Sequence, residues 1–155
     1  MTPGGPELPL ARLFAMAYRD LVDALHDRLV QRGWRDVRPA FGFVLLAARD
    51  QPVTITQVAT LMGTTKQAAS KLAGSILDAG YLEPGAASAD SRERPLRLSS
   101  RGTRLLADVE EVYAELEAEW ADAIGRSGLS RLRRDLTKAV AAAHGGRLPA
   151  VRPPS

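Results

Sequence analysis

Apolar residues recur at intervals of three and four over most of the chain, which is the spacing of helices that bury one face. One such stripe runs from Leu10 to Leu29, and a second runs from Leu105 to Trp120. The pattern predicts six helices, at about residues 10–32, 39–49, 57–62, 65–79, 100–124 and 131–144.

Small polar residues stand where these helices should begin. A serine or threonine side chain can accept a hydrogen bond from a free N–H group in the first helical turn. We expect such caps at Thr56, at Thr64 or Thr65, at Ser99 or Ser100, and at Ser130. Glycines should end three of the helices, at Gly33, Gly63 and Gly80, and residues 125–128 should form a turn.

Three short segments are predicted to be strands, because their apolar and polar residues alternate or because they interrupt the helical spacing. They are 53–55, a segment that starts at Leu82, and 94–98, with a loop over 84–91 between the last two. The fold class is therefore mainly α with a small β wing. The short third helix, the turn at Gly63 and the fourth helix form a helix-turn-helix, and the hairpin packs beside it.

The fourth helix has two different faces. Its buried face should hold Ala69, Leu72, Ala73, Ile76 and Leu77. Its outer face carries Thr65, Lys66, Gln67, Ser70 and Lys71, and no acid occurs there before Asp78. Such a face suits phosphate, and glutamine and lysine can also hydrogen-bond to base edges.

Each of these polar residues also has a purely structural interpretation. Thr64 and Gln67 have the spacing of a capping box, in which each side chain bonds the backbone of the other residue. Thr65 could hold a phosphate or only cap the helix. Ser70 could be an ordinary surface serine.

Charge is weak overall but patterned locally. The formal net charge is +3, yet residues 92–104 hold five arginines and one acid, Glu93. Residues 108–122 hold seven acids and no base, and residues 126–138 hold five bases and one acid. The acidic and basic blocks could pair across the turn or between chains, or they could simply be solvated.

Several function classes are excluded by missing residue types. The chain has no cysteine, and its two histidines, His26 and His144, have no cluster of potential metal ligands around them in the sequence. It contains no nucleophile–base motif and no phosphate-binding loop, so we expect neither an enzyme nor a cofactor. Without a signal peptide or a membrane-spanning stretch, a cytoplasmic location is expected.

The stretch 55–102 resembles the MarR family of winged helix-turn-helix transcription regulators. The match rests on ITQVATLMGTTKQAASKLAGSILDAGYLE, on Asp90-Ser91-Arg92-Glu93-Arg94 and on Leu98-Ser99-Ser100-Arg101-Gly102. These three segments cover about a third of the chain, and the flanking helices agree with the family only in order and length. Pro84-Gly85 and Ala87-Ser88 depart from the usual wing, so the first wing strand should be short.

The resemblance implies that Asp90 pairs with Arg92 and fixes the wing, while Arg92 reaches into a minor groove with Arg94 beside it. An exposed salt bridge without DNA contact is the alternative. The predicted DNA-binding residues are Thr64, Thr65, Lys66, Gln67, Ser70, Lys71, Asp90, Arg92 and Arg94.

The resemblance also implies a homodimer whose terminal helices interlock, in agreement with the long apolar stripes of the outer helices. We divide the chain into a disordered tail at 1–9, an N-terminal dimerisation helix at 10–38, a DNA-binding lobe at 39–100, C-terminal dimerisation helices at 101–144 and a disordered tail at 145–155. Two lobes would read an inverted-repeat operator.

Many family members respond to small phenolic or lipophilic molecules. The residues in the corresponding region are Tyr18, His26, Trp34, Arg38, Phe41 and Phe43, although their aromatic rings could simply pack in the core. The expected function is a sequence-specific regulator that binds double-stranded DNA, and a repressor released by a ligand. The alternatives are a winged-helix module that binds protein and a DNA-binding protein without a ligand.

Overall fold

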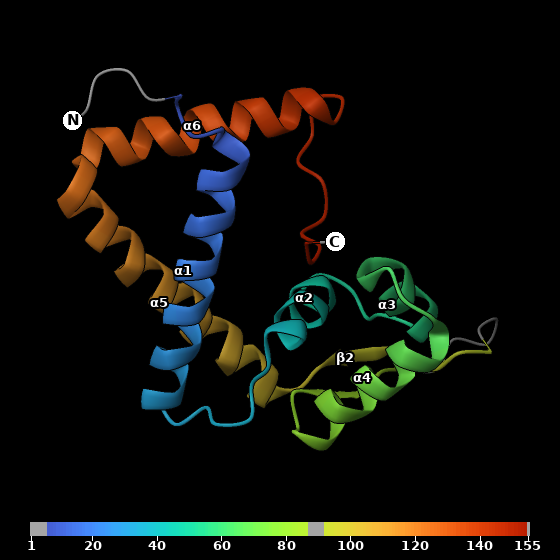
Figure 1. Ribbon diagram of the computed structural model, residues 1–155. Coiled ribbons are helices and arrows are strands. Elements are labelled where there is room, and N and C mark those ends of the chain that lie inside the picture. The colour runs from blue at the N-terminus through green and yellow to red at the C-terminus, as the bar shows by residue number, and fades with distance from the viewer. Residues whose placement is uncertain (1–5, 87–91, 155) are drawn as a thin grey trace.

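The computed structural model describes residues 6–86 and 92–154. It contains six helices and one two-stranded antiparallel sheet in the order that the sequence predicts (Figure 1). The elements are α1 (Leu10–Gln31), α2 (Pro39–Ala48), α3 (Ile55–Met62), α4 (Lys66–Asp78), β1 (Leu82–Pro84), β2 (Leu96–Leu98), α5 (Ser100–Ile124) and α6 (Arg126–Ala143).

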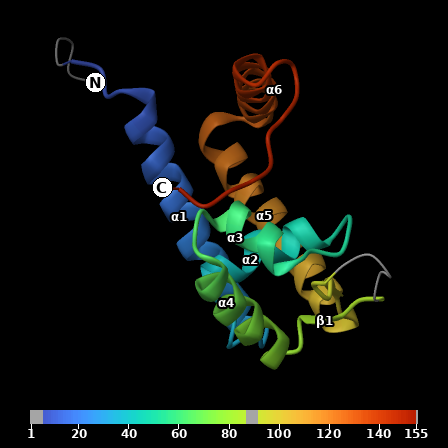
Figure 2. The same ribbon diagram turned by 90° about the vertical axis from the view of Figure 1, so that its right-hand side faces the viewer.

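The molecule has a helical base and a smaller lobe (Figure 1). The long helices α1 and α5 cross and pack on each other, and α6 lies across their upper ends. The lobe holds α2, α3, α4 and the sheet, with α4 along its lower edge (Figures 1 and 2). None of the helices in the described part of the chain is long and apolar enough to cross a membrane.

The start of α3 differs from the expected one. Thr54, not Thr56, caps the helix, and it forms a capping box with Gln57. The backbone N–H of Gln57 donates to the Thr54 hydroxyl over 3.2 Å, and the backbone N–H of Thr54 donates to the Gln57 side chain over 2.9 Å. A capping box satisfies two free N–H groups, whereas a single cap at Thr56 satisfies one.

The next two helices begin at expected caps. The Thr65 hydroxyl accepts a hydrogen bond from the Ala68 N–H over 3.1 Å. The Ser99 hydroxyl accepts one from the Gly102 N–H over 3.0 Å, and it also donates to the Gly80 carbonyl. Ser99 therefore ties the start of α5 to the end of α4.

The predicted cap of the last helix at Ser130 is wrong. The helix α6 begins at Arg126, directly after Gly125, whose φ is +82°. A glycine can adopt this left-handed conformation without strain, so α5 and α6 are joined by one residue instead of a four-residue turn.

The wing strands are three residues long, and the register pairs Leu82 with Leu98 and Pro84 with Leu96. The predicted short first strand is confirmed. The returning strand begins at Leu96, two residues later than predicted. The predicted strand at 53–55 is reduced to one bridge, in which Val53 and Leu96 exchange two hydrogen bonds of 2.8 Å.

The core lies where the base meets the lobe. Leu29 of α1, Leu45 of α2, Ile76 of α4 and Leu105 of α5 are at most 1% exposed, as is Tyr81 between α4 and β1. Gly102 lies so close to this core that a Cβ atom there would stand 2.1 Å from the Tyr81 carbonyl oxygen. The lobe is therefore held against the start of α5 by close backbone contact.

Candidate nucleic-acid interface

The outer face of α4 is open to solvent. All six predicted residues in this region are exposed, namely Thr64, Thr65, Lys66, Gln67, Ser70 and Lys71. Four of them, together with Ala68, line a shallow depression along the helix. The opposite face is buried at Ala69, Ala73 and Ile76. The division into a core face and an outer face therefore follows the sequence prediction.

The hydrogen bonds at the start of α4 decide between two interpretations of its polar residues. Thr65 is the cap, so its hydroxyl is already engaged by the helix. No capping box forms between Thr64 and Gln67. Among the residues that the structure describes, the Gln67 side chain has no hydrogen-bond partner. Its amide is therefore available to an external group.

A contact between the wing and the helix-turn-helix was not anticipated from the sequence. Glu93, at the base of the wing, accepts a hydrogen bond of 2.6 Å from the Thr56 hydroxyl on α3. The same carboxylate oxygen lies 3.8 Å from the Lys66 Nζ atom at the start of α4. The hydrogen bond from Thr56, assisted by the Lys66 charge, lowers the pKa of the Glu93 carboxyl.

The two arginines beside Glu93 point into solvent. Arg92 and Arg94 are exposed, and neither has an ion-pair partner within the described parts of the chain. Arg97, by contrast, is paired with Glu83 across the wing at 2.9 Å. Asp90, the predicted partner of Arg92, lies outside the described residues. Among the described residues, Arg92 and Arg94 are therefore wing cations without an ion-pair partner.

Arg101 belongs to the basic block of the sequence, and its side chain is exposed but lies against two aromatic rings. Its guanidinium lies over the rings of Trp34 and Tyr81, at 5.1 and 5.0 Å from their centroids. It also lies 3.8 Å from Asp36, and it donates to the Ala79 carbonyl over 3.2 Å. Arg101 thus joins the linker after α1 to the end of α4 and the start of α5.

Tyr81 completes this cluster beneath the wing. Its ring is fully buried, and its hydroxyl donates a hydrogen bond to the Asp36 carboxylate. Burial, reinforced by the Asp36 charge, raises the pKa of Tyr81 to about 12. The residue therefore stays neutral over the physiological range and holds Asp36 in place as a donor.

An apolar cavity of about 270 Å³ lies between α1, α2 and α5. Three of the six predicted ligand residues line it, Tyr18, His26 and Phe43. The other three lie elsewhere. Phe41 is buried in the core under the Arg38 guanidinium, and the Trp34 Nε1 atom donates to Asp108 over 2.6 Å.

Most of the cavity wall comes from residues that the sequence analysis assigned to helix packing or did not single out. They include Leu25, Leu29, Leu105, Leu106, Val109 and Tyr113. Burial in this wall raises the pKa of Tyr113. A helical stripe that faces a cavity has the same sequence pattern as one that faces a core, so periodicity could not reveal these residues.

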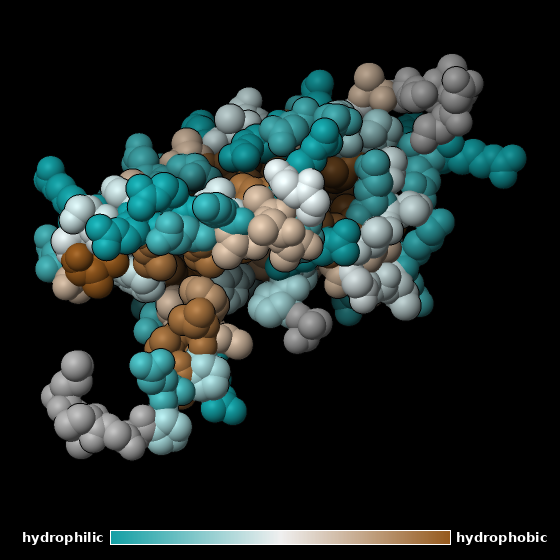
Figure 3. Space-filling model, turned by 90° about the horizontal axis from the view of Figure 1, so that it is seen from above, coloured by the Kyte–Doolittle hydropathy of each residue, from teal (hydrophilic) through white to brown (hydrophobic). Residues whose placement is uncertain are grey.

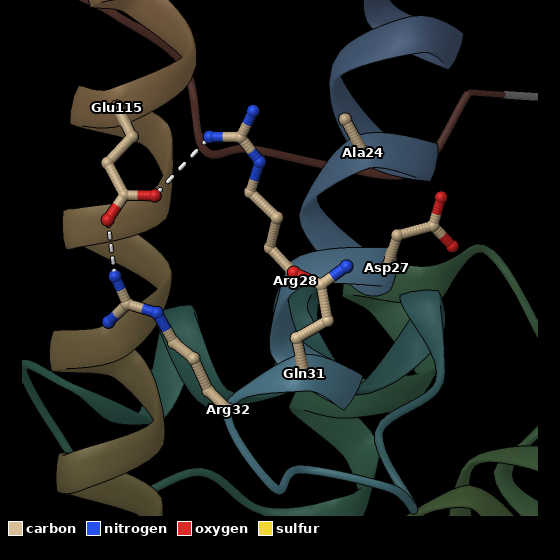
Figure 4. Close-up of a pocket in the computed structure, with 6 residues that line it drawn as sticks. All are labelled: Ala24, Asp27, Arg28, Gln31, Arg32 and Glu115. Carbon is tan, nitrogen blue, oxygen red and sulfur yellow. Dashed lines mark hydrogen bonds and ion pairs between the residues drawn. The ribbon is translucent and has the colours of Figure 1, made fainter.

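The acidic block of α5 pairs mainly with α1. Glu115 lies between two arginines of α1 and accepts from Arg28 over 3.3 Å and from Arg32 over 2.5 Å (Figure 4). Arg28 also bonds Glu119, and Arg32 bonds Glu111 over 2.8 Å. Between α5 and the basic block of α6, Glu117 forms an ion pair with Arg133. Arg28, Arg32 and Glu115 line a polar depression between α1 and α5, and their ion pairs join the two helices of the base.

Metal-binding geometry is not found in the part of the chain that the structure describes. No three histidine or carboxylate side chains there are grouped so that they could hold an ion. Both histidines bond to a backbone carbonyl one turn earlier, His26 to Val22 and His144 to Val140.

The fold has close counterparts among solved structures. Apo MarR from E. coli aligns with a TM-score of 0.71 at 18% identity over 87% of this chain and 99% of that chain. RV1404 from Mycobacterium tuberculosis aligns with a TM-score of 0.70 at 21% identity over 95% and 100%. A mutant of S. aureus MepR bound to an oligodeoxyribonucleotide gives 0.59 at 18% identity over 88% and 99%. The chain has a MarR-like winged-helix fold.

This likeness is one of structure. No protein-family model matches the sequence, and no curated protein matches it either. In the MarR-like fold of this chain, α3 and α4 form the helix-turn-helix, β1 and β2 form the wing, and α1, α5 and α6 form the base.

Proposed function

We propose that this protein is a transcription regulator that binds double-stranded DNA in a sequence-specific manner. The observation that carries the proposal is the exposed outer face of α4, which lies next to the exposed wing arginines Arg92 and Arg94. Lys66, Lys71, Arg92 and Arg94 provide positive charge, and the exposed side chains of this face include no acid before Asp78. The MarR-like fold and the DNA bound to a MepR mutant support the same proposal.

In the proposed complex, α4 lies in the major groove. Gln67, Ser70 and Lys71 would reach base edges or phosphates from its exposed face, with Thr64, Thr65 and Lys66 at the helix start near the backbone. Arg92, with Arg94 beside it, would enter the adjacent minor groove, where the negative potential is concentrated. Asp90 would orient Arg92.

We further propose that the protein acts as a homodimer. The start of α1 and the middle of α6 expose apolar side chains, and Figure 3 shows apolar groups among hydrophilic ones on the upper side of the molecule. The exposed residues include Leu10, Leu13, Phe14, Leu132 and Leu136. Burying such a surface against a second copy would stabilise the pair, since apolar burial is worth about 25 cal/mol per Å². Two lobes would then read an inverted repeat with half-sites one turn of DNA apart.

The cavity between α1, α2 and α5 is the proposed effector site. Its wall is mostly apolar, and Tyr18, His26 and Glu110 supply polar groups. A small phenolic or lipophilic molecule fits this chemistry. Its binding between the base and the lobe would change the spacing of the two α4 helices and release the operator, which is the behaviour of a repressor.

The deciding experiment is the salt dependence of binding to duplex DNA. Binding to random duplex should weaken steeply as salt rises, because phosphate contacts release counterions. Selection from a random duplex pool should then recover an inverted repeat. The absence of duplex affinity at low salt would overturn the proposal in favour of a protein-binding winged helix. If the selected sequences lack two-fold symmetry, the proposal that a homodimer binds two inverted half-sites is wrong.

A further inference from the structure

The segment after α6 turns back toward the lobe. The last helix ends at Ala143, and Gly145 and Gly146 follow with φ values of +66° and +91°. The Gly146 N–H donates to the Ala141 carbonyl over 2.8 Å and closes the helix end. Residues 147–154 form neither helix nor strand, and they run from α6 down to α2 and α3 (Figures 1 and 2).

This segment contacts both parts of the molecule. Val151 lines the cavity between α1, α2 and α5 and is 56% exposed, so it faces both the cavity and solvent. Arg152 lines a neighbouring depression between the end of α2 and α3, together with Pro52 and Leu61. Pro153 is half-buried. The segment therefore spans from the base to the first helix of the helix-turn-helix.

Leu148 offers a comparison within the same segment. It is as apolar as Val151 and similarly exposed, at 60% against 56%. It lines neither the cavity between α1, α2 and α5 nor the neighbouring depression at Pro52. The two residues therefore differ in their position relative to the cavity, and Leu148 can serve as a matched control.

We propose that residues 147–154 act as a strap that closes the effector cavity, with Val151 at its mouth, and that a small apolar ligand must displace this strap to enter. This inference rests on the cavity of the proposed function and adds its regulation. Because the strap and the ligand compete, the apparent ligand affinity equals the intrinsic affinity multiplied by the fraction of molecules in which the strap is open. Displacing Val151 also removes the connection through Arg152 to α3.

The first test compares Val151→Asp with Leu148→Asp in the full chain. The probe is 1-anilinonaphthalene-8-sulfonate, whose fluorescence rises in apolar cavities. Val151→Asp should bind the dye about threefold more tightly, since about half of a valine side chain leaves the cavity mouth. Leu148→Asp should bind it as the unchanged protein does. Equal affinities in all three proteins, or an equal gain in both variants, would overturn the strap.

The second test detects the contact directly in the unchanged protein. Nuclear Overhauser effects should connect the Val151 methyl groups with ring protons of Tyr18, Phe43 or Tyr113, and the Leu148 methyl groups should show none to these rings. Their absence for Val151 would overturn the proposal. Neither test uses DNA, so a failure of DNA binding leaves both results intact, and a failure of the strap leaves DNA binding intact.

Discussion

The Thr56 hydroxyl donates a 2.6 Å hydrogen bond to Glu93, and the same carboxylate oxygen faces the Lys66 ammonium at 3.8 Å. One acidic side chain of the wing therefore touches both helices of the helix-turn-helix. It fixes the distance between the wing and α4, and it also lies beside a cation that the proposed function assigns to DNA. These two effects have different experimental signatures.

Glu93→Gln separates them, because glutamine keeps an acceptor for Thr56 and removes the charge. The lowered pKa of Glu93 means that the carboxylate is charged at neutral pH. Without it, Lys66 is free to neutralise a phosphate, so the slope of log K against log salt should steepen by about one unit. Fluorescence anisotropy with random duplex measures this slope. Glu111→Gln, on the far helix α5, is the matched control and should leave it unchanged.

Lys71→Ala should act in the opposite direction. The side chain is exposed and has no partner among the described residues, so its removal costs the fold little. Binding to all duplexes should weaken, and the salt slope should flatten by about one unit. Lys138→Ala on α6 removes the same charge at a position away from the proposed DNA-binding face, and it should leave the salt slope unchanged. An unchanged slope for Lys71→Ala would remove this residue from the phosphate contacts.

Arg92→Ala should reduce affinity for the selected operator by about tenfold or more, the value of one charge-assisted hydrogen bond. The melting temperature should stay the same, since Arg92 is exposed and unpaired within the described residues. Arg97→Ala removes an arginine that Glu83 already neutralises, and it should cost less affinity. A fall in stability with Arg92→Ala would instead assign this residue to wing structure.

Tyr81→Phe removes the hydrogen bond to Asp36 and should lower the free energy of unfolding by about 1–2 kcal/mol. Tyr18→Phe is the control, because the Tyr18 hydroxyl has no hydrogen bond among the described residues.

The stabilisation by Tyr81 should also depend on pH in a definite direction. Folded Tyr81 keeps its proton to about pH 12, whereas an unfolded tyrosine loses it near pH 10.0. The contribution of protonated Tyr81 to the free energy of unfolding is therefore complete below pH 10 and disappears as the pH rises to 12. Urea unfolding at pH 9 and pH 11 should show this loss, and Tyr81→Phe should reduce it.

Gly102→Ala should destabilise the protein by about 3 kcal/mol, because the new Cβ atom would overlap the Tyr81 carbonyl oxygen at 2.1 Å and force the backbone to move. Gly42→Ala in α2 adds the same methyl group where no atom lies within 4 Å. That variant should be more stable by about 0.5–1 kcal/mol, since alanine favours helix. Thermal unfolding of both variants tests the comparison, and equal stabilities would contradict the close approach.

Most of the fold was predictable because it depends on periodicity. The stripe on α4 buries Ala69, Ala73 and Ile76 and leaves Lys66 and Lys71 outside, as expected from spacing alone. Helix ends were less predictable because neighbouring polar residues compete. Thr54 and not Thr56 caps α3, because Gln57 completes a capping box with it. The helix α6 begins after Gly125 and not after Ser130, because the positive φ of Gly125 allows the chain to change direction at one residue.

The parts of the site that the sequence could not predict involve contacts between distant segments. Glu93 contacts Thr56, which is 37 positions away in the sequence, and the Arg101 guanidinium lies over the Trp34 ring and near Asp36. The cavity wall also escaped prediction, since Leu105 and Val109 look like ordinary core residues in a helical stripe. Charge type and spacing identified the outer face of α4, but only packing shows which arginines remain free.

The helix α6 extends over 18 residues without burying one of them. In a single copy of the chain, this helix packs only partially against the ends of α1 and α5 and keeps much of its surface in solvent. If a second copy completes the packing, folding of α6 and assembly become one equilibrium, and the melting temperature should rise with protein concentration. The amount of protein in the cell would then set both how much of it is fully folded and how much of the operator it occupies.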